Sequence, residues 1–160
     1  MRASPLPRPS YQEISRREMA DRIAIRELVD AYARCADGRD AEAQMSLFTE
    51  DTHFVMRDGK NPRPSQEIHS RKALAPIFAD LKQYDTVMHF NGQSTIHTLA
   101  DGSAAGETYC LAHLVSVTSE GRRLTVISVR YLDAFRKIDD RWFFAERIAY
   151  VDWTHERAIG

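Results

Sequence analysis

The fold is decided by a stretch of alternating residues, AAGETYCLAHLVSVT, at positions 104–118. Successive side chains of a β-strand point to opposite faces of a sheet, so alternation of residue types separates the two faces. One face of this stretch is apolar except for a histidine, and it carries Tyr109, Leu111, His113, Val115 and Val117. The stretch therefore predicts a long strand with a buried face.

Three further strand-like runs accompany this stretch, at about 86–99, 124–137 and 142–153. Turn-forming residues such as Ser119-Glu120-Gly121 and Asp139-Asp140 separate the runs. Long apolar runs joined by short turns predict an antiparallel meander. Glycines inside two of the runs, Gly92 and Gly106, are expected to mark bends that curve the sheet.

The first half of the chain shows helical spacing instead. Ser15 begins a Ser-x-x-Glu capping box, and apolar residues then recur at helical intervals at Ile25, Leu28, Val29, Tyr32 and Ala36. The pair Asp37-Gly38 is expected to end this helix, with Gly38 in the left-handed conformation.

Two more helices are expected before the meander. Asp40 can cap a second, short helix, and Ser70 a third that runs to about Lys82. Pro76 lies inside the third segment and argues against an unbroken helix, because proline cannot donate a backbone hydrogen bond. A short strand at 52–56 separates the second helix from the third.

Together these patterns predict an α+β domain in which a cone-shaped, curved antiparallel sheet is closed by three N-terminal helices. We expect residues 15–160 to form this single domain. Residues 1–14 are proline-rich, and we expect a flexible N-terminal arm there.

Composition excludes several classes of protein. The chain has 160 residues, 43% of them hydrophobic, and 22 Lys and Arg balance 23 Asp and Glu, which leaves no basic footprint for nucleic acid. It has no apolar run long enough to span a membrane, and we expect no secretory signal. Two cysteines, Cys35 and Cys110, are too few for a disulfide framework, so we expect a cytoplasmic protein.

Two of the six histidines stand out from the rest. His89 lies within a strand between Met88 and Phe90, and His113 lies on the otherwise apolar face. A buried histidine needs a polar partner, and Asp37 at the predicted helix end is the best candidate. Tyr32 on the buried stripe would bring a hydroxyl to the same region. The alternative is that Asp37 only ends a helix and Tyr32 only fills the core.

Four segments of the chain resemble a known family. The segments that carry the likeness are ADRIAIRELVDAYARCADGRD (20–40), MHFNG (88–92), AAGETYCLAH (104–113) and RYLDAFRKIDDRW (130–142). They are similar to the SnoaL-like branch of the nuclear transport factor 2-like superfamily. Its members include scytalone dehydratase, bile-acid 7α-dehydratase and hexachlorocyclohexane dehydrochlorinase, and the resemblance implies a cone-shaped α+β barrel with a deep hydrophobic cavity.

The resemblance also implies catalytic residues. Asp37 and His89 match the Asp-His dyad of the dehydratases and the dehydrochlorinase, Tyr32 matches a site tyrosine, and His113 matches a second site histidine of scytalone dehydratase. We expect the substrate to contact Phe54, Met56, Tyr109, Tyr131 and Trp153, which would line the cavity. Tyr131 and Met56 stand where scytalone dehydratase has other residues, which argues against scytalone as the substrate.

The expected function is therefore a cofactor-independent lyase acting on a small hydrophobic cyclic molecule. His89 would take a proton from carbon, and His113 or Tyr32 would give one to the leaving oxygen. A cyclase or isomerase using the same dyad, or a non-catalytic binding module, is the alternative.

We expect no metal, because the set Asp37, His89 and His113 lacks the spacing of known metal motifs. The last strand is apolar on both faces at Trp142, Phe143, Phe144 and Trp153. An apolar outer face favours a homodimer or homotrimer.

Overall fold

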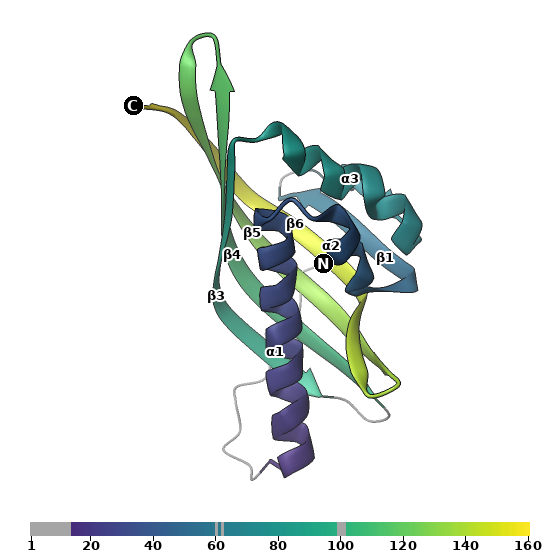
Figure 1. Ribbon diagram of the computed structural model, residues 1–160. Coiled ribbons are helices and arrows are strands. Elements are labelled where there is room, and N and C mark those ends of the chain that lie inside the picture. The colour runs from purple at the N-terminus through teal and green to yellow at the C-terminus, as the bar shows by residue number, and fades with distance from the viewer. Residues whose placement is uncertain (1–13, 60, 62, 99–101) are drawn as a thin grey trace.

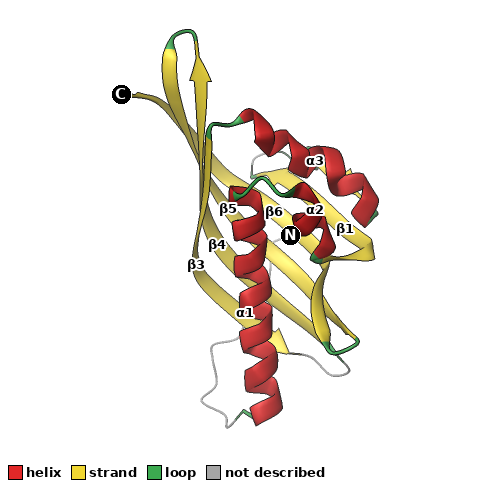
Figure 2. Ribbon diagram, viewed as in Figure 1, coloured by secondary structure: helices red, strands yellow, loops and turns green. Residues whose placement is uncertain are grey.

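The computed structural model describes residues 14–59, 61, 63–98 and 102–160 and shows helices packed on one face of a curved sheet (Figures 1 and 2). Of the predicted arm, residues 1–13 lie outside the described residues. The elements in chain order are α1 (Arg16–Asp37), α2 (Ala41–Ser46), β1 (Phe48–Asp58), β2 (Gln66–Ile68), η1 (Arg71–Leu74), α3 (Ala75–Ala79), η2 (Asp80–Gln83), β3 (Thr86–Thr98), β4 (Ser103–Thr118), β5 (Gly121–Ile138) and β6 (Arg141–Ile159).

The sheet has six strands in the order β2-β1-β6-β5-β4-β3. The predicted meander is confirmed, because β3, β4, β5 and β6 pair antiparallel in sequence. The sheet as a whole is mixed rather than purely antiparallel, since β1 pairs parallel with β6. β6 is therefore hydrogen-bonded on both sides, to β5 and to β1.

Helix α1 begins and ends close to the predicted residues. The Ser15 hydroxyl accepts a hydrogen bond from the Glu18 backbone N–H at 3.1 Å, which caps the first turn. The predicted stripe is buried in full: Ile25, Leu28, Val29, Tyr32 and Ala36.

The end of α1 departs from the expectation for its glycine. Gly38 keeps a right-handed φ of −75°, and Arg39 adopts the positive φ of 56°. The Arg39 guanidinium donates to the backbone oxygens of Tyr84 and Asp85, at 3.0 and 2.8 Å. The left-handed conformation therefore falls on Arg39, one residue after the predicted Gly38, and these two hydrogen bonds hold the Arg39 side chain.

The third predicted helix is divided into three short pieces, η1, α3 and η2. Pro76 stands in the first turn of α3, where its missing N–H costs nothing. The segment also follows β1 and β2, so only α1 and α2 precede the sheet. Together the helical elements cover the concave face of the sheet (Figure 1).

Two irregularities in the β5–β6 pairing decide which side chains face inward. The register shifts between Ala134 and Phe135 and again between Ser128 and Val129. Opposite them, β6 carries an extra residue at Ala145 and at Asp152. Because one extra residue reverses the alternation, β6 changes face twice along its length.

A cluster of aromatic rings fills the core between the helices and the sheet. Tyr32 makes edge-to-face contacts with the rings of Phe48, Phe78, Tyr131 and Phe144, at centroid distances of 5.9 to 6.0 Å. Such pairs add about 0.5–1.5 kcal/mol each beyond the burial of their area. In the described part of the chain, no helix is long and apolar enough to cross a membrane.

Candidate active site

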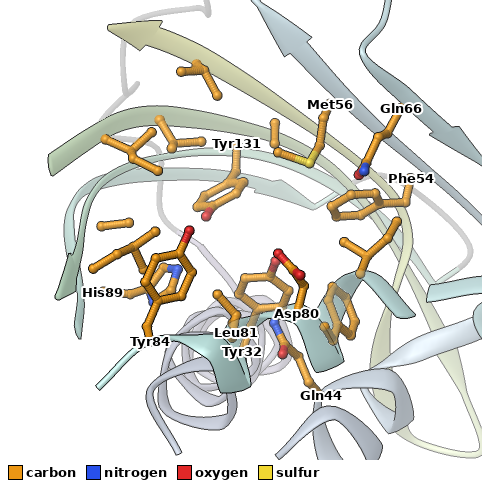
Figure 3. Close-up of a pocket in the computed structure, with 18 of the residues that line it drawn as sticks. Tyr32, Gln44, Phe54, Met56, Gln66, Asp80, Leu81, Tyr84, His89 and Tyr131 are labelled. Carbon is orange, nitrogen blue, oxygen red and sulfur yellow. The ribbon is translucent and has the colours of Figure 1, made fainter. Parts of the chain in front are cut away.

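A cavity of about 620 Å³ lies between the concave face of the sheet and the helical layer. Its walls are mainly apolar, and they come from α1, β1, α3 and the meander. A volume of this order suits a small organic molecule. Figure 3 shows His89 and Tyr84 on one side, and Phe54, Met56 and Gln66 on the other.

His89 and Asp37 form the predicted pair. The Nδ1 atom of His89 lies 2.9 Å from Oδ1 of Asp37, and the same oxygen accepts the His89 backbone N–H at 2.8 Å. The His89 side chain is 9% exposed and that of Asp37 31% exposed. Two donors from one residue fix the carboxylate, so Asp37 does more than end α1.

The local sequence explains this meeting. Asp37 is the last residue of α1, and α1 runs along β3, where Asp30 is hydrogen-bonded to Asn91 and Asp37 to His89. Alternation along β3 turns Met88 and Phe90 outward, where they are exposed, and turns His89 inward to the cavity.

The tautomer of His89 follows from its partner. A carboxylate can only accept, so Nδ1 carries the proton and Nε2 carries the lone pair. Nε2 has no hydrogen-bond partner among the residues that the structure describes. His89 thus presents the lone pair of Nε2 to a mainly apolar cavity.

Two tyrosines project into the cavity from opposite walls, Tyr32 from α1 and Tyr131 from β5 (Figure 3). Burial raises the pKa of Tyr32, and it raises the pKa of Tyr131 well above its usual value. Both hydroxyls are therefore neutral at physiological pH and available as hydrogen-bond donors.

A buried ion pair lies directly behind these tyrosines. Arg147 donates to both carboxylate oxygens of Asp133, at 2.8 and 2.9 Å, and both side chains are fully buried. The guanidinium lies 4.1 Å from the ring centre of Tyr32 and 4.2 Å from that of Tyr131. Burial alone would lower the pKa of Arg147, but the charge and hydrogen bonds of Asp133 raise it, so Arg147 stays charged.

This pair was not predicted from the sequence, although the sequence holds a signal for it. Arg147 is a charged residue within the apolar run of the last strand, and Asp133 lies opposite it in the register. Nη1 of Arg147 is buried without a hydrogen-bond partner in the described part of the chain. A cation with a spare donor behind two cavity tyrosines favours negative charge on a nearby oxygen.

Two predicted site residues, His113 and Tyr109, lie outside the cavity. On β4, Thr108, Cys110, Ala112 and Leu114 are buried, and Ala112 and Leu114 line the cavity. His113 and Tyr109 alternate with them and therefore point to the convex face. The sequence predicted the alternation but assigned the buried face to the wrong set of residues.

Trp153 is also misplaced by the prediction, and a bulge is the reason. Val151 lines the cavity, and strict alternation would put Trp153 beside it. The extra residue at Asp152 reverses the alternation, so Trp153 pairs with Ser128 on the convex face and is 50% exposed.

The other predicted lining residues are in place: Phe54, Met56 and Tyr131 line the cavity. The polar lining was missed and consists of Gln44, Gln66, Asp80 and Tyr84. Buried Gln44 has a side-chain oxygen without a partner in the described residues. Burial raises the pKa of the Cys110 thiol to about 11, which suits a core residue rather than a nucleophile.

The convex face carries several exposed apolar side chains. Besides Tyr109 and Trp153, they include Met88, Phe90, Leu111 and Val117. The expected homodimer or homotrimer would use such a surface, and it stays a prediction. Asp37, His89 and His113 do not come together as a set of metal ligands, because His113 faces the convex side.

Helices over the concave face of a curved mixed sheet, with a cavity between the two layers, define the cone of the nuclear transport factor 2-like fold. The chain belongs to the SnoaL-like domain family, which matches residues 17–148. No curated protein matches the sequence.

Solved structures share the fold at low sequence identity. A candidate scytalone dehydratase from Novosphingobium aromaticivorans DSM 12444 is 18% identical, with a TM-score of 0.77 over 89% of this chain and 91% of that chain. Hexachlorocyclohexane dehydrochlorinase LinA-type3 from Novosphingobium barchaimii LL02 is 14% identical, with a TM-score of 0.70 over 88% and 92%. The beta subunit of a candidate aromatic-ring-hydroxylating dioxygenase from Novosphingobium aromaticivorans DSM 12444 is 19% identical, with a TM-score of 0.70 over 85% and 92%.

Proposed function

We propose that the protein is a cofactor-independent lyase of the dehydratase type, acting on a small, hydrophobic, cyclic substrate. One observation carries the proposal: Nδ1 of His89 is bound to Asp37 at 2.9 Å while the ring lines a cavity of about 620 Å³. This arrangement is that of a general base with its orienting carboxylate.

The first step is removal of a proton from carbon by Nε2 of His89. The imidazolium that forms is stabilised by Asp37, because the hydrogen bond from Nδ1 strengthens when the ring becomes charged. The mainly apolar walls screen this charge pair less than water would. Asp37 thus acts through His89, and His89 is the catalytic residue.

The electron pair left by the broken C–H bond has to be stabilised. In a substrate with a carbonyl beside the acidic carbon, they move onto the carbonyl oxygen as an enolate. The hydroxyls of Tyr32 and Tyr131 donate hydrogen bonds to that oxygen, and the buried Arg147 behind them favours the negative charge.

Loss of the leaving group completes the reaction. The enolate collapses to a carbon–carbon double bond as the bond to a neighbouring hydroxyl breaks. His89 returns its proton to the departing oxygen, so water leaves and the base is restored. Because His113 faces the convex surface, it takes no part in this scheme.

Shared chemistry supports the reaction class. Dehydration and dehydrochlorination both remove a proton from carbon and a group from its neighbour, and both names occur among proteins of this fold. The mainly apolar lining supports a hydrophobic substrate, and polar side chains at Gln44, Gln66 and Asp80 would orient it.

The test is turnover of a panel of cyclic ketones and cyclic β-hydroxyketones in D₂O, followed by mass spectrometry. We expect deuterium incorporation next to the carbonyl and loss of water, and we expect both to disappear in His89→Ala. The matched control is His155→Ala, an exposed histidine on the convex face, which should retain full activity.

Other results would overturn the proposal in distinct ways. Exchange without loss of water would indicate an isomerase or cyclase with the same base. Binding without exchange would indicate a binding module, and full activity of His89→Ala would end the assignment of the base.

A further inference from the structure

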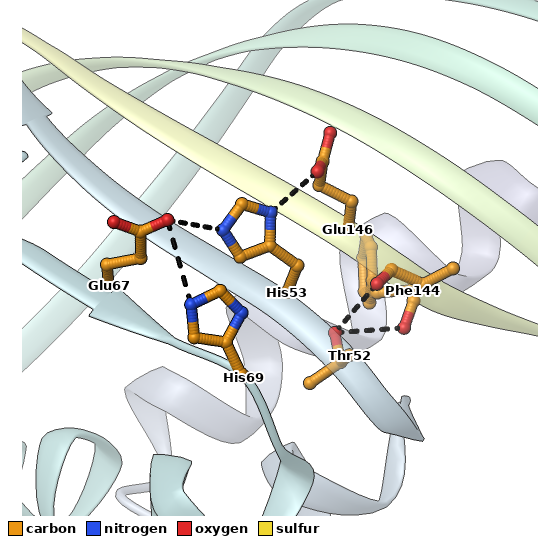
Figure 4. Close-up of polar contacts among 7 residues, drawn as sticks. Thr52, His53, Glu67, His69, Phe144 and Glu146 are labelled. Carbon is orange, nitrogen blue, oxygen red and sulfur yellow. Dashed lines mark hydrogen bonds and ion pairs between the residues drawn. The ribbon is translucent and has the colours of Figure 1, made fainter.

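A second cluster of titratable groups lies on the convex side of the sheet, where β2, β1 and β6 adjoin. It comprises His53 on β1, Glu67 on β2, His69 just after β2, and Glu146 on β6 (Figure 4). Phe54 and Gln66, the neighbours of His53 and Glu67, line the cavity, so the cluster is on the opposite face. The proposed lyase reaction does not use it.

Three ligand atoms converge in this cluster. Nε2 of His53 lies 3.0 Å from Oε1 of Glu67, and Nε2 of His69 lies 3.7 Å from the same oxygen. One ligand atom from each of the three residues lies within 4.8 Å of the others. The two imidazole rings are parallel, with centroids 4.8 Å apart and planes 8° apart.

A metal ion explains this convergence better than a proton does. Nδ1 of His53 lies 2.7 Å from Oε2 of Glu146. Because a carboxylate oxygen accepts, Nδ1 of His53 carries the proton of this hydrogen bond. In the neutral ring, the proton on Nδ1 leaves the lone pair of Nε2 facing a lone pair of Glu67, and either a second proton or a metal cation at Nε2 relieves this repulsion. A proton can join only two atoms, whereas His69 brings a third donor to the same place.

We propose that His53, Glu67 and His69 bind a divalent transition metal, with Zn²⁺ as the best fit, and that Glu146 orients His53. Two imidazole nitrogens and one carboxylate form a donor set that Zn²⁺ favours, at bond lengths of about 2.0–2.2 Å. The contact from Nδ1 of His53 to Glu146 reproduces the carboxylate–histidine–metal arrangement of such sites.

The donors can close on an ion when His69 moves. Tetrahedral ligands at these bond lengths are about 3.3 Å apart. Nε2 of His53 and Oε1 of Glu67 already lie 3.0 Å apart, whereas Nε2 of His69 has to approach Oε1 from 3.7 Å while its ring turns out of the parallel stack with His53. The His69 side chain is 72% exposed and that of Glu67 46% exposed, so both can rotate without disturbing the core. His53 is held by Glu146 and needs to move least.

Such an ion would fasten a wall of the cavity. β2 has three residues and pairs only with β1, at Phe54, Val55 and Met56. Gln66 lines the cavity beside Glu67, and η1 and α3 follow directly after His69. The metal would tie this edge of the sheet to β1 from outside, without touching the substrate.

The experiment is a titration of the tag-free full chain with ZnCl₂ by isothermal calorimetry, with MgCl₂ as a comparison. We expect one Zn²⁺ per chain and no matching Mg²⁺ binding. His69→Ala and Glu67→Gln should each weaken Zn²⁺ binding by at least about tenfold, and Glu146→Gln by about 10- to 100-fold. The matched control His155→Ala should bind as the unmodified chain does.

A spectroscopic readout tests the donor set directly. Co²⁺ in place of Zn²⁺ should give visible absorption of a four- or five-coordinate site, and His69→Ala should remove that absorption. Zn²⁺ binding that is unchanged in both His69→Ala and Glu67→Gln would overturn the proposal. Equal binding of Mg²⁺ would also overturn it, because it would indicate simple attraction to exposed carboxylates.

Discussion

Two histidine–carboxylate pairs lie on opposite faces of one sheet, His89 with Asp37 on the concave face and His53 with Glu146 on the convex face. In both pairs Nδ1 is bound to a carboxylate oxygen, at 2.9 and 2.7 Å. The pairs differ at Nε2, which meets the cavity in His89 and the carboxylate of Glu67 in His53. The neighbour of the second nitrogen therefore decides whether such a pair suits proton transfer or cation binding.

The largest expected effect comes from removing the carboxylate charge of Asp37. Asp37→Asn keeps an oxygen that can accept from His89 but loses the charge that stabilises the imidazolium. We expect turnover of the cyclic substrate to fall by about 10²- to 10⁴-fold, measured as the initial rate. The parallel change Glu146→Gln should lower that rate far less, because Glu146 does not meet the cavity, and an equal loss in both variants would erase the functional difference between the two faces.

The next largest effect concerns stability and contrasts a buried ion pair with an exposed one. Arg147→Met leaves Asp133 buried without its partner, and we expect the free energy of unfolding in urea to fall by about 3–5 kcal/mol. The exposed pair Arg130–Asp152 has a similar two-bond geometry, at 2.9 and 2.7 Å. Arg130→Met should cost about 0.2–1 kcal/mol.

A double variant keeps this comparison interpretable if Arg147→Met fails to fold. Adding Asp133→Asn removes the unpaired carboxylate, so the double variant should recover much of the lost stability. No recovery would show that Arg147 acts through its contacts with Tyr32, Tyr131 and Phe144 rather than through its charge.

A smaller effect is expected at the cavity hydroxyls. Tyr32→Phe keeps the four edge-to-face ring contacts and removes only the donor to the substrate oxygen. We expect kcat to fall by about 10²-fold, with the free energy of unfolding nearly unchanged. The change Tyr109→Phe on the convex face is the matched control, and an equal loss there would contradict the assignment of Tyr32.

The smallest effect is a pH dependence at Asp21 on α1. The hydrogen bond from Lys137 lowers the pKa of Asp21 below its ordinary 3.8, and the Trp142 indole also donates to the carboxylate. Because the folded pKa is lowered, this stabilisation is present above pH 3.8 and is lost as the pH falls through the folded value.

The measurement is urea unfolding of the unmodified chain and of Asp21→Asn between pH 6 and pH 3. The difference in unfolding free energy should be largest at pH 6 and should shrink toward pH 3. A difference that stays constant would assign the effect to hydrogen bonding without charge.

Local patterns were enough to predict most of the fold. The capping box at Ser15 and the stripe of α1 follow helical geometry, and the four long strands follow alternation and turn residues. These features depend on residues close in sequence. The parallel contact of β1 with β6 joins distant segments, and nothing in either segment encodes it.

The residues of the candidate site were predicted only in part, because the site joins segments that are distant in the sequence. His89 and Asp37 were found because the family motif marks both residues. His113, Tyr109 and Trp153 were placed in the cavity wrongly, since alternation gives two faces but not which one is concave. The convex cluster was missed because strand pairing joins His53 to Glu146 across 93 positions.

The two bulges divide β6 into three segments, and the inward-facing residues change between even and odd positions from each segment to the next. Substitutions should therefore be tolerated at different alternate positions in each segment. Even positions Trp142 and Phe144 are buried first, then the odd positions Arg147, Ala149 and Val151 face the interior, and beyond Asp152 the order reverses again. If Asp152 were paired in a regular ladder instead of being the extra residue, strict alternation would carry Trp153 to the concave side and Thr154 to the convex side. The positions of the two extra residues, as much as the side chains of this strand, set the shape of the space that a substrate meets.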